Sequence, residues 1–272
     1  MVKLRKSIRA VLKTIVVQSH RSRSLNEWIE LCQNSVRLWA DIHRFDYQFL
    51  DDGLFDYLPT RDLLRQYNAV VASDLARLHW LRALLVEYER VIWCDADWLV
   101  MDVERFQPLR STYALGREVW IDQTGTGELK AFKKVHNAYL QFDRGNTFLD
   151  FYIETAEQFL NKNTGGVPNQ FIGPKLLTAI HNVVGLPVNE NAGMLSPLLA
   201  AALLRREGVL EPVEYERLKK HAFERVIALF QRRSVQMPLA LNLSASCIEA
   251  AGLDARKIVI LCDVLGEGVL VK

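Results

Sequence analysis

Cysteine is scarce in this chain and is not spaced for metal binding. The four cysteines are Cys32, Cys94, Cys247 and Cys262. No two form a Cys-x-x-Cys pair, and Cys94 and Cys262 stand inside apolar runs. This usage argues against a disulfide framework and against a zinc site built on cysteine. We therefore expect the protein to work in a reducing compartment.

Long apolar runs and an excess of one charge are also missing. The longest apolar stretch, residues 193–204, contains Pro197 and is shorter than the roughly 20 residues that span a bilayer, so we expect a core helix there. Lys13 interrupts the one apolar core that a secretory signal could use, and we expect no such signal. The net charge of +2 does not favour a nucleic-acid-binding protein.

Basic residues nevertheless gather in two segments, residues 3–23 and 217–233. Seven Lys and Arg precede Glu27, the first acidic residue of the chain. Both clusters can be solvated surface, and the second can also face a neighbouring subunit. Alternatively, they hold the protein against anionic lipid heads without crossing the membrane.

Short β-branched or apolar runs alternate with segments of helical periodicity. We predict strands at residues 14–18, 47–50, 90–94, 113–115, 119–121, 137–142 and 258–262. We predict helices at residues 25–37, 73–87, 147–160, 175–181 and 214–233, the second with Ser73 or Asp74 at its N-terminal cap. The β-α-β order at the start of the chain is typical of an open α/β sheet.

Two carboxylates follow the apolar strand at residues 90–94. Residues two apart on an extended chain face the same side, so Asp95 and Asp97 can address one ion. Carboxylate oxygens suit Mg²⁺ or Mn²⁺, which usually complete their shell with water and phosphate oxygens. The pair therefore indicates a site where a metal ion holds a diphosphate, at the sheet edge where α/β proteins bind ligands.

A second polar group lies upstream, in Ser73-Asp74-x-x-Arg77. One interpretation of Ser73 is purely structural, as the N-terminal cap of the helix without contact to a ligand. Arg77, one turn later, can reach a phosphate or a sugar hydroxyl, for which its planar fork is suited.

Four segments taken in order resemble a known group of enzymes. They are Ser73-Asp74-Leu75-Ala76-Arg77, then Val91 to Asp97, then Asn137 to Phe142 with Arg144-Gly145-Asn146, and finally Gly173-Pro174-Lys175-Leu176-Leu177-Thr178. Together they resemble retaining glycosyltransferases of the GT-A fold with an Asp-x-Asp motif. Among these enzymes, the four segments most resemble glycosyltransferase family 32, which is associated with capsular polysaccharide synthesis. The spacing from Arg77 to Asp95 is similar to that of family 8.

The resemblance implies a single GT-A domain over residues 1–272. Its open mixed sheet is flanked by helices, with a nucleotide-sugar-binding half (14–110), an acceptor-side half (111–272) and a helical C-terminal portion. It implies transfer of a hexose from a nucleotide sugar, here a UDP-sugar, to a glycan or lipid-linked saccharide in surface polysaccharide synthesis. Such an enzyme would work in the cytoplasm, with peripheral attachment to the inner face of the membrane as a further option.

The resemblance also implies roles for particular residues. Donor binding falls to Ser73, Asp74, Arg77, Asp95 and Asp97. Mn²⁺ or Mg²⁺ would be held by Asp97 and Asp95, with Asn242 and Ser244 as candidates for a late ligand. Asn137, Gly173 and Pro174 fall on the side of the donor sugar and the acceptor. No catalytic nucleophile is identified.

Two other functions stay open at this point. A phosphohydrolase of the haloacid-dehalogenase type also carries Asp-x-Asp after an apolar strand, but that motif usually opens the domain, and a later Lys and acidic pair are required. A GT-A homologue that binds sugar without activity is the other alternative. Release of nucleoside diphosphate with and without Mn²⁺ separates these possibilities.

Overall fold

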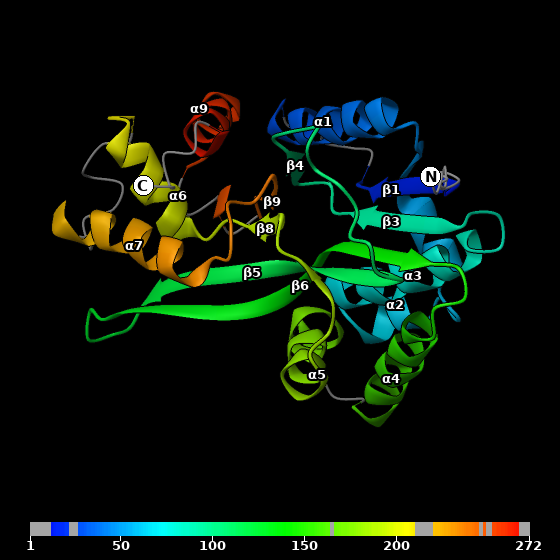
Figure 1. Cartoon of the computed structure of the whole chain (residues 1–272). Helices are drawn as coiled ribbons and strands as arrows, with labels where there is room; N and C mark the ends of the chain where they lie inside the picture. The colour runs from blue at the N-terminus through cyan, green and yellow to red at the C-terminus, as the bar shows by residue number, and fades with distance from the viewer. Residues whose placement is uncertain are drawn as a thin grey trace, which may run out of the picture.

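The computed structural model describes residues 12–21, 27–163, 166–209, 220–244, 247–248 and 252–266, which form an α/β structure with two sheets (Figure 1). The strands are β1 (Thr14–Ser19), β2 (Asp46–Leu50), β3 (Arg90–Cys94), β4 (Trp98–Val100), β5 (Tyr113–Gln123), β6 (Leu129–Asp143), β7 (Val188–Asn189), β8 (Ala192–Met194) and β9 (Ala240–Asn242). The helices are α1 (Glu27–His43), α2 (Leu63–Gln66), α3 (Ala69–Leu84), α4 (Phe148–Lys162), α5 (Leu176–Val184), α6 (Pro197–Arg206), α7 (Lys220–Arg233) and α9 (Ala255–Gly266). A 3₁₀ turn, η1 (Asp52–Tyr57), and a π-helical turn, η2 (Phe171–Lys175), complete the described elements.

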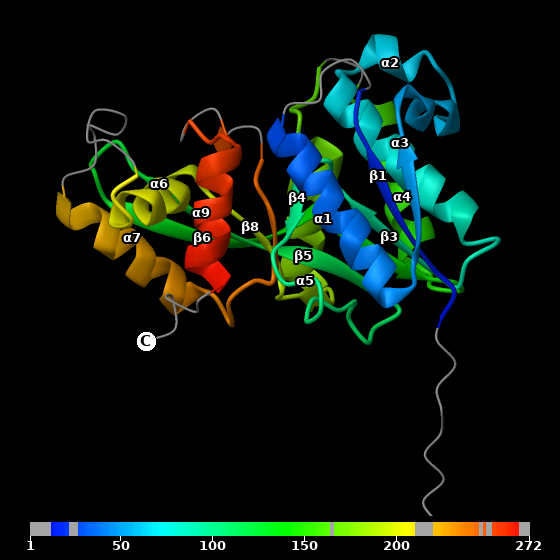
Figure 2. The same cartoon turned by 90° about the horizontal axis from the view of Figure 1, so that it is seen from above.

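The larger sheet is mixed and open. Its strand order is β2-β1-β3-β6-β5-β7, with β1, β2 and β3 parallel to one another and β6 antiparallel to β3. Helix α1 packs on one face through Val36 and Trp39, while α3, α4 and α5 cover the other face. The predicted α/β class, with an open mixed sheet flanked by helices and a helical C-terminal portion, is confirmed (Figure 2).

Alternation along the strands explains why both faces are covered. In β1, Val16 packs with the α1 side, whereas Ile15 and Val17 pack with the α3 side. A strand that buries both faces carries a continuous apolar run, which is what the sequence has at this point. The strands predicted at residues 14–18, 47–50 and 90–94 are confirmed, as is the helix between the first two, which extends to His43.

The long β5–β6 hairpin corrects one prediction. The two short strands expected at residues 113–115 and 119–121 are one strand with a bulge between Leu115 and Gly116. The polar residues inside it are buried with partners, since the Arg117 guanidinium donates to Glu190 at 2.8 Å. Gly116 lies against the His136 ring so closely that a Cβ there would clash with it.

The outer half of this hairpin carries the C-terminal helices. Helices α6, α7 and α9 gather there in both views, away from β1 and β3 (Figures 1 and 2). The strand predicted at residues 258–262 is wrong, because this segment lies within α9. Its buried Ile258, Leu261 and Leu265 follow helical spacing. The core helix expected over residues 193–204 begins only at Pro197, capped by Ser196, after the short strand β8.

The start of α3 also differs from expectation. Asn68 caps this helix by accepting a hydrogen bond from the backbone N–H of Val71, so Ser73 and Asp74 lie inside the helix rather than at its cap. Helix α5 begins one residue later than predicted, after the π-helical turn. Parts of both basic clusters, residues 3–11, 22–23 and 217–219, lie outside the described residues. Within the described ranges, no helix is long and apolar enough to cross a membrane.

The smaller sheet places β9, a strand late in the chain, beside the Asp-x-Asp turn. Strand β4, directly after the Asp-x-Asp turn, pairs antiparallel with β9, and β9 pairs parallel with β8. Trp98 lies opposite Asn242 in this register. Because of this pairing, residues near 242 lie beside those near 97.

Candidate functional site

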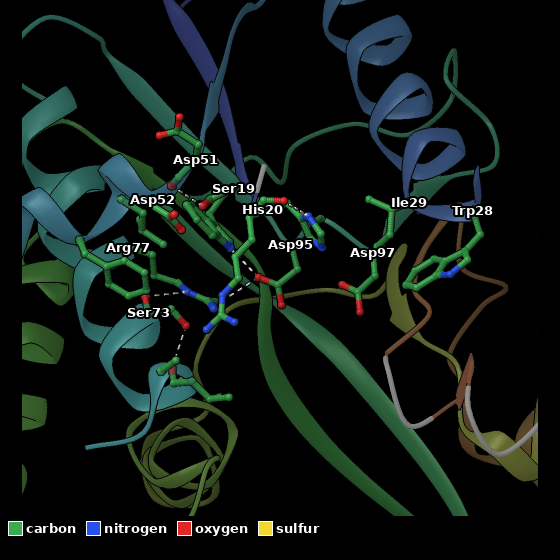
Figure 3. A pocket seen from close by; sticks show the side chains of 17 residues that line it. Ser19, His20, Trp28, Ile29, Asp51, Asp52, Ser73, Arg77, Asp95 and Asp97 are labelled. Carbon is green, nitrogen blue, oxygen red and sulfur yellow. Dashed lines mark hydrogen bonds and ion pairs between the residues drawn. The ribbon is translucent and has the colours of Figure 1, made fainter. Parts of the chain in front are cut away.

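A cavity of about 490 Å³ opens at the carboxyl ends of the parallel strands. Its walls come from the segment after β1, the first turn of α1, η1, the first turns of α3 and the turn after β3. Figure 3 shows Ser73 and Arg77 on one side, Trp28 and Ile29 from α1 on the other, and Asp95 and Asp97 between them. This is the position at which an open α/β sheet binds its ligands.

The Asp95–Asp97 turn is fixed through its backbone. The Asp95 N–H donates to the carbonyl of Ala138 at 2.9 Å, and the Asp95 carbonyl accepts from the Gln18 side chain at 2.9 Å. The same carbonyl accepts from the N–H of Trp98 at 3.0 Å, which closes the turn. Contacts from three strands therefore hold both aspartates where the sheet ends.

In each of the two carboxylates, side-chain hydrogen bonds are made to one oxygen, Oδ1. Oδ1 of Asp95 accepts from Nη1 of Arg77 at 2.9 Å and from the indole N–H of Trp93 at 2.6 Å. Oδ1 of Asp97 accepts from the amide of Asn242 at 2.7 Å. No side chain among the described residues donates a hydrogen bond to Oδ2 of either aspartate. One oxygen of each carboxylate thus accepts no side-chain hydrogen bond from the described residues, and both aspartates line the cavity.

The environment of Asp97 disfavours its charge. Burial, followed by the nearby charge of Asp95, raises the pKa of the Asp97 carboxyl to about 7, although its bond from Asn242 acts in the opposite direction. Without a cation, this environment favours the protonated carboxyl more than water does. A bound divalent cation favours the ionised form, so the pair is suited to hold one.

Arg77 lines the cavity and is held in place by contacts with other residues of the protein. Its Nη2 lies 3.1 Å from Asp74, its Nη1 also donates to the carbonyl of Asn137 at 3.1 Å, and its Nε to that of Ser73 at 3.4 Å. The guanidinium stacks on the Trp93 ring, 4.9 Å from the centroid. These contacts give Arg77 one position, with one face toward the cavity.

Asp74 lies behind Arg77 and does not line the cavity. It is buried, and burial raises the pKa of its carboxyl to about 6, although the charge of Arg77 opposes this shift. It accepts a hydrogen bond from the Asn137 amide at 2.8 Å. Its contacts are those of a residue that orients Arg77, while Ser73 lines the cavity with its hydroxyl bonded to the carbonyl of Val70.

The segment at Gly173 packs against the side chains of Asp74 and Asn137. A Cβ at Gly173 would lie 2.6 Å from Oδ2 of Asp74 and 2.8 Å from the amide nitrogen of Asn137. The structure therefore brings Asn137 and Gly173 to Asp74, with Pro174 next in the π-helical turn. None of Asn137, Gly173 and Pro174 lines the cavity.

The two candidates for a late metal ligand differ in position. Asn242 is buried at the end of β9 and meets Asp97 through its amide nitrogen, which donates and cannot bind a cation. Ser244 has a positive φ of 52° and accepts a hydrogen bond from the N–H of Cys247 at 3.2 Å. Ser244 does not line the cavity. No cluster of three or more His, Cys, Asp or Glu suited to a metal exists in the described part of the chain.

The donor set nevertheless fits a Mg²⁺ or Mn²⁺ ion shared with a ligand. Two carboxylates that line one cavity can supply part of a hard-oxygen shell, and these ions normally take the remainder from water and phosphate. Asp95 and Asp97 are the residues that would hold it.

Sequence reasoning missed several residues of the site. Gln18 is fully buried at the end of β1, and a polar residue at the end of an apolar strand is the signal that could have found it. Asp51 and Asp52 directly follow β2, the strand predicted at residues 47–50, and both line the cavity. Trp28 lies within the helix predicted at residues 25–37 and lines the cavity as well. The direction of the Trp93 N–H leaves no signal in the sequence.

Comparisons with known proteins leave the family open. No family model and no curated protein matches this chain. Among solved structures, it is similar to a glycosyltransferase involved in the glycosylation of the major capsid of PBCV-1, with a TM-score of 0.43 and 8% identity over 88% of this chain and 97% of that one. The galactosyltransferase LgtC, in complex with donor and acceptor sugar analogs, gives a TM-score of 0.40 and 14% identity over 93% and 95%. The 4-diphosphocytidyl-2C-methyl-D-erythritol synthase of Anaerococcus prevotii DSM 20548 gives 0.31 and 9% over 65% and 86%.

Likenesses of this strength assign neither a family nor an activity. We therefore base the function on the residues of this chain.

Proposed function

We propose that this chain is a metal-dependent retaining glycosyltransferase of the GT-A fold. It moves a hexose from a nucleotide sugar, most simply a UDP-sugar, to a glycan or lipid-linked saccharide in surface polysaccharide synthesis. The observation that carries the proposal is the pair of carboxylates, Asp95 and Asp97, that line the same cavity of about 490 Å³ and each have a side-chain donor to one oxygen only. The four motifs of the sequence support the same assignment.

The acidic cavity explains why a cation is needed. Asp51, Asp52, Asp95 and Asp97 line it, against Arg21 and Arg77. A diphosphate would be repelled by these carboxylates unless a divalent cation lay between them. When bound, such an ion neutralises the charge that develops on the leaving diphosphate. Asp95 and Asp97 would hold it.

The other residues of the cavity divide into charged and apolar sides. Arg77 lines the cavity beside Trp93, where its guanidinium, held by its bonds within the protein, would attract a phosphate or a sugar hydroxyl. Trp28, Leu54, Phe55 and Val70 offer apolar surface for a base or a sugar ring. Asp74 and Asn137 orient Arg77 from behind rather than contacting the donor.

The alternatives gain no support from the cavity. A haloacid-dehalogenase-type mechanism needs a lysine and further acids, yet no lysine among the described residues lines the cavity, and Asp263 is exposed on α9. Against an inactive sugar-binding homologue stands the presence together of Asp74, Arg77, Asp95 and Asp97, the residues that the motif of an active enzyme requires.

The enzyme would act where nucleotide sugars are made, in the cytoplasm. Lipid-linked acceptors would place it at the inner face of the membrane, and the basic residues of α7 could assist a weak peripheral attachment. Nucleic acid is not among the expected partners.

The proposal is tested by release of nucleoside diphosphate from a panel of nucleotide sugars. Each donor is incubated with the protein in Mn²⁺, in Mg²⁺ and in EDTA, with p-nitrophenyl phosphate as a substrate for the phosphohydrolase alternative. We expect one donor to be cleaved in the presence of metal and none in EDTA. Metal-independent release, or hydrolysis of the phosphate ester alone, would overturn the proposal.

A further inference from the structure

Trp93 contacts two residues of the site at once. Its ring face carries the guanidinium of Arg77, 4.9 Å from the centroid, and its edge N–H donates to Oδ1 of Asp95 at 2.6 Å. Arg77 donates to the same oxygen at 2.9 Å. The three side chains therefore form a closed triangle, and each fixes the other two.

Neither donor to Asp95 is free to move. Trp93 is 2% exposed on β3 and packs in the core with α3, and Arg77 is also tied to Asp74 and to the carbonyl of Asn137. The two bonds fall on one oxygen of Asp95, so the carboxylate cannot rotate without breaking both. The second oxygen has no side-chain donor among the described residues, and Asp95 lies on the wall of the cavity (Figure 3).

Asp97 is oriented differently, by one amide. Its Oδ1 accepts from Asn242, which is supplied by a distant strand. The site thus orients its two carboxylates by separate devices: an indole and a guanidinium for Asp95, and an amide for Asp97.

We propose that Trp93 is a positioning residue for Asp95, and that its indole N–H sets the affinity of the site for a divalent cation. The inference rests on the proposed function, because it takes Asp95 and Asp97 as the residues that hold the ion. Groups that orient metal ligands typically change metal affinity or activity by roughly 10–100-fold when they are removed. Loss of this N–H would let the carboxylate turn, whereas the stacked ring could still support Arg77.

The test uses the full chain and Mn²⁺ as the probe. Free Mn²⁺ is followed by electron paramagnetic resonance as it is titrated into wild type, Trp93→Phe and Trp80→Phe. Phe keeps an aromatic face under Arg77 but lacks the N–H. Trp80 is the matched control, since it lies on α3, does not line the cavity, and has an indole N–H without a hydrogen-bond partner.

We expect Trp93→Phe to bind Mn²⁺ about 10–100-fold more weakly than wild type, and Trp80→Phe to stay within about twofold. In the transferase assay, Trp93→Phe should raise the Mn²⁺ concentration for half-maximal rate. The kcat at saturating Mn²⁺ should change much less, whereas a general structural defect would lower kcat at every concentration. Thermal unfolding and circular dichroism check the fold of each variant.

The outcomes separate this inference from the proposed function. Equal Mn²⁺ affinity of wild type and Trp93→Phe would overturn the role of Trp93 while leaving the transferase intact. Absence of Mn²⁺ binding by wild type would overturn both. Should Trp93→Phe fail to fold, β-(3-benzothienyl)alanine at position 93 decides the matter, because it keeps the bicyclic shape and lacks the N–H. Wild-type affinity in that variant would contradict the inference.

Discussion

The amide nitrogen of Asn242 lies 2.7 Å from Oδ1 of Asp97, although 145 residues separate the two in the chain. The pairing of β9 with β4 creates this contact, since Asn242 stands opposite Trp98 in the register. A backbone hydrogen bond joins the same two segments, since the N–H of Leu243 donates to the carbonyl of Asp97 at 3.0 Å. The end of the chain thus completes a site that begins at β3.

Asp97→Asn tests whether the buried carboxyl of Asp97 lowers the stability of the metal-free protein at high pH. Burial raises the pKa of Asp97 to about 7 in the folded protein, against an ordinary value of 3.8. A raised carboxyl pKa stabilises the protonated protein at low pH, and this contribution is lost as the pH rises through 7. The neutral Asn avoids that loss and can still accept the bond from Asn242.

We therefore expect Asp97→Asn without metal to be more stable than wild type at pH 8, by at least about 1 kcal/mol, the equivalent of one pKa unit. The difference should vanish near pH 4. Urea unfolding at both pH values measures it. A variant less stable than wild type at pH 8 would show that Asp97 is ionised there without penalty.

Arg77→Lys tests the guanidinium. A lysine ammonium cannot meet Asp74, Asp95 and the carbonyl of Asn137 together in the way that the planar fork does. We expect kcat/KM for the donor to fall by about 10–100-fold, corresponding to roughly 1–3 kcal/mol.

The control for Arg77→Lys is Arg82→Lys, on the same helix but about half exposed and 3.9 Å from Asp150. Its kinetics should match those of wild type. If both variants behave alike, the fork of Arg77 has no special role in the site.

Gly173→Ala should disturb the site from behind. The added Cβ would fall 2.6 Å from Oδ2 of Asp74, so Asp74, which contacts Arg77, would have to shift. We expect a loss of about 1–3 kcal/mol in the free energy of unfolding, the usual cost of overpacking, together with weaker donor binding. Gly125→Ala is the control, because nothing lies within 4 Å of the position its Cβ would take. Unfolding titrations that give Gly173→Ala and Gly125→Ala the same stability would refute this account.

Much of the fold follows from local patterns in the sequence. Strands β1 and β3 carry continuous apolar runs, and α4 has regular helical spacing, so each could be predicted from its own residues. The hairpin could not, because Arg117 and Glu118 interrupt its apolar pattern. They are buried with partners that lie elsewhere in the sequence, among them Glu190 for Arg117 and Lys134 for Glu118. In α9, the short run Ile258 to Leu261 fits a strand and a helix equally well.

In the candidate site too, some residues could be predicted from the sequence and others could not. Asp95 and Asp97 could be predicted because the turn follows directly from the end of an apolar strand. The burial of Asp74 behind Arg77 could not, since it depends on Asn137 and Gly173 packing from other elements. Metal binding and the roles of these residues stay predictions.

Peripheral attachment is tested by reversing charge on α7. Arg225 and Arg232 lie exposed on this helix, one on each side of Ala228 and Leu229. Each well-placed basic residue contributes about 1 kcal/mol of attraction to anionic lipid, so the double variant Arg225→Glu, Arg232→Glu should lose most co-sedimentation with phosphatidylserine vesicles at low salt.

The matched control is Lys162→Glu, Lys175→Glu, which reverses two exposed charges on another part of the surface. It should bind vesicles as wild type does. Binding by wild type should also fall as salt is raised. No binding at low salt, or binding that does not depend on salt, would exclude the electrostatic attachment.

The most direct test of the account is nucleoside diphosphate release by wild type and Asp97→Ala, each with Mn²⁺ and with EDTA, on the donor that wild type accepts. We predict turnover only for wild type in Mn²⁺, with Asp97→Ala folded and inactive because one of the two carboxylates that would hold the ion is gone. Full activity of wild type in EDTA, or turnover by Asp97→Ala at the wild-type rate, would contradict the account.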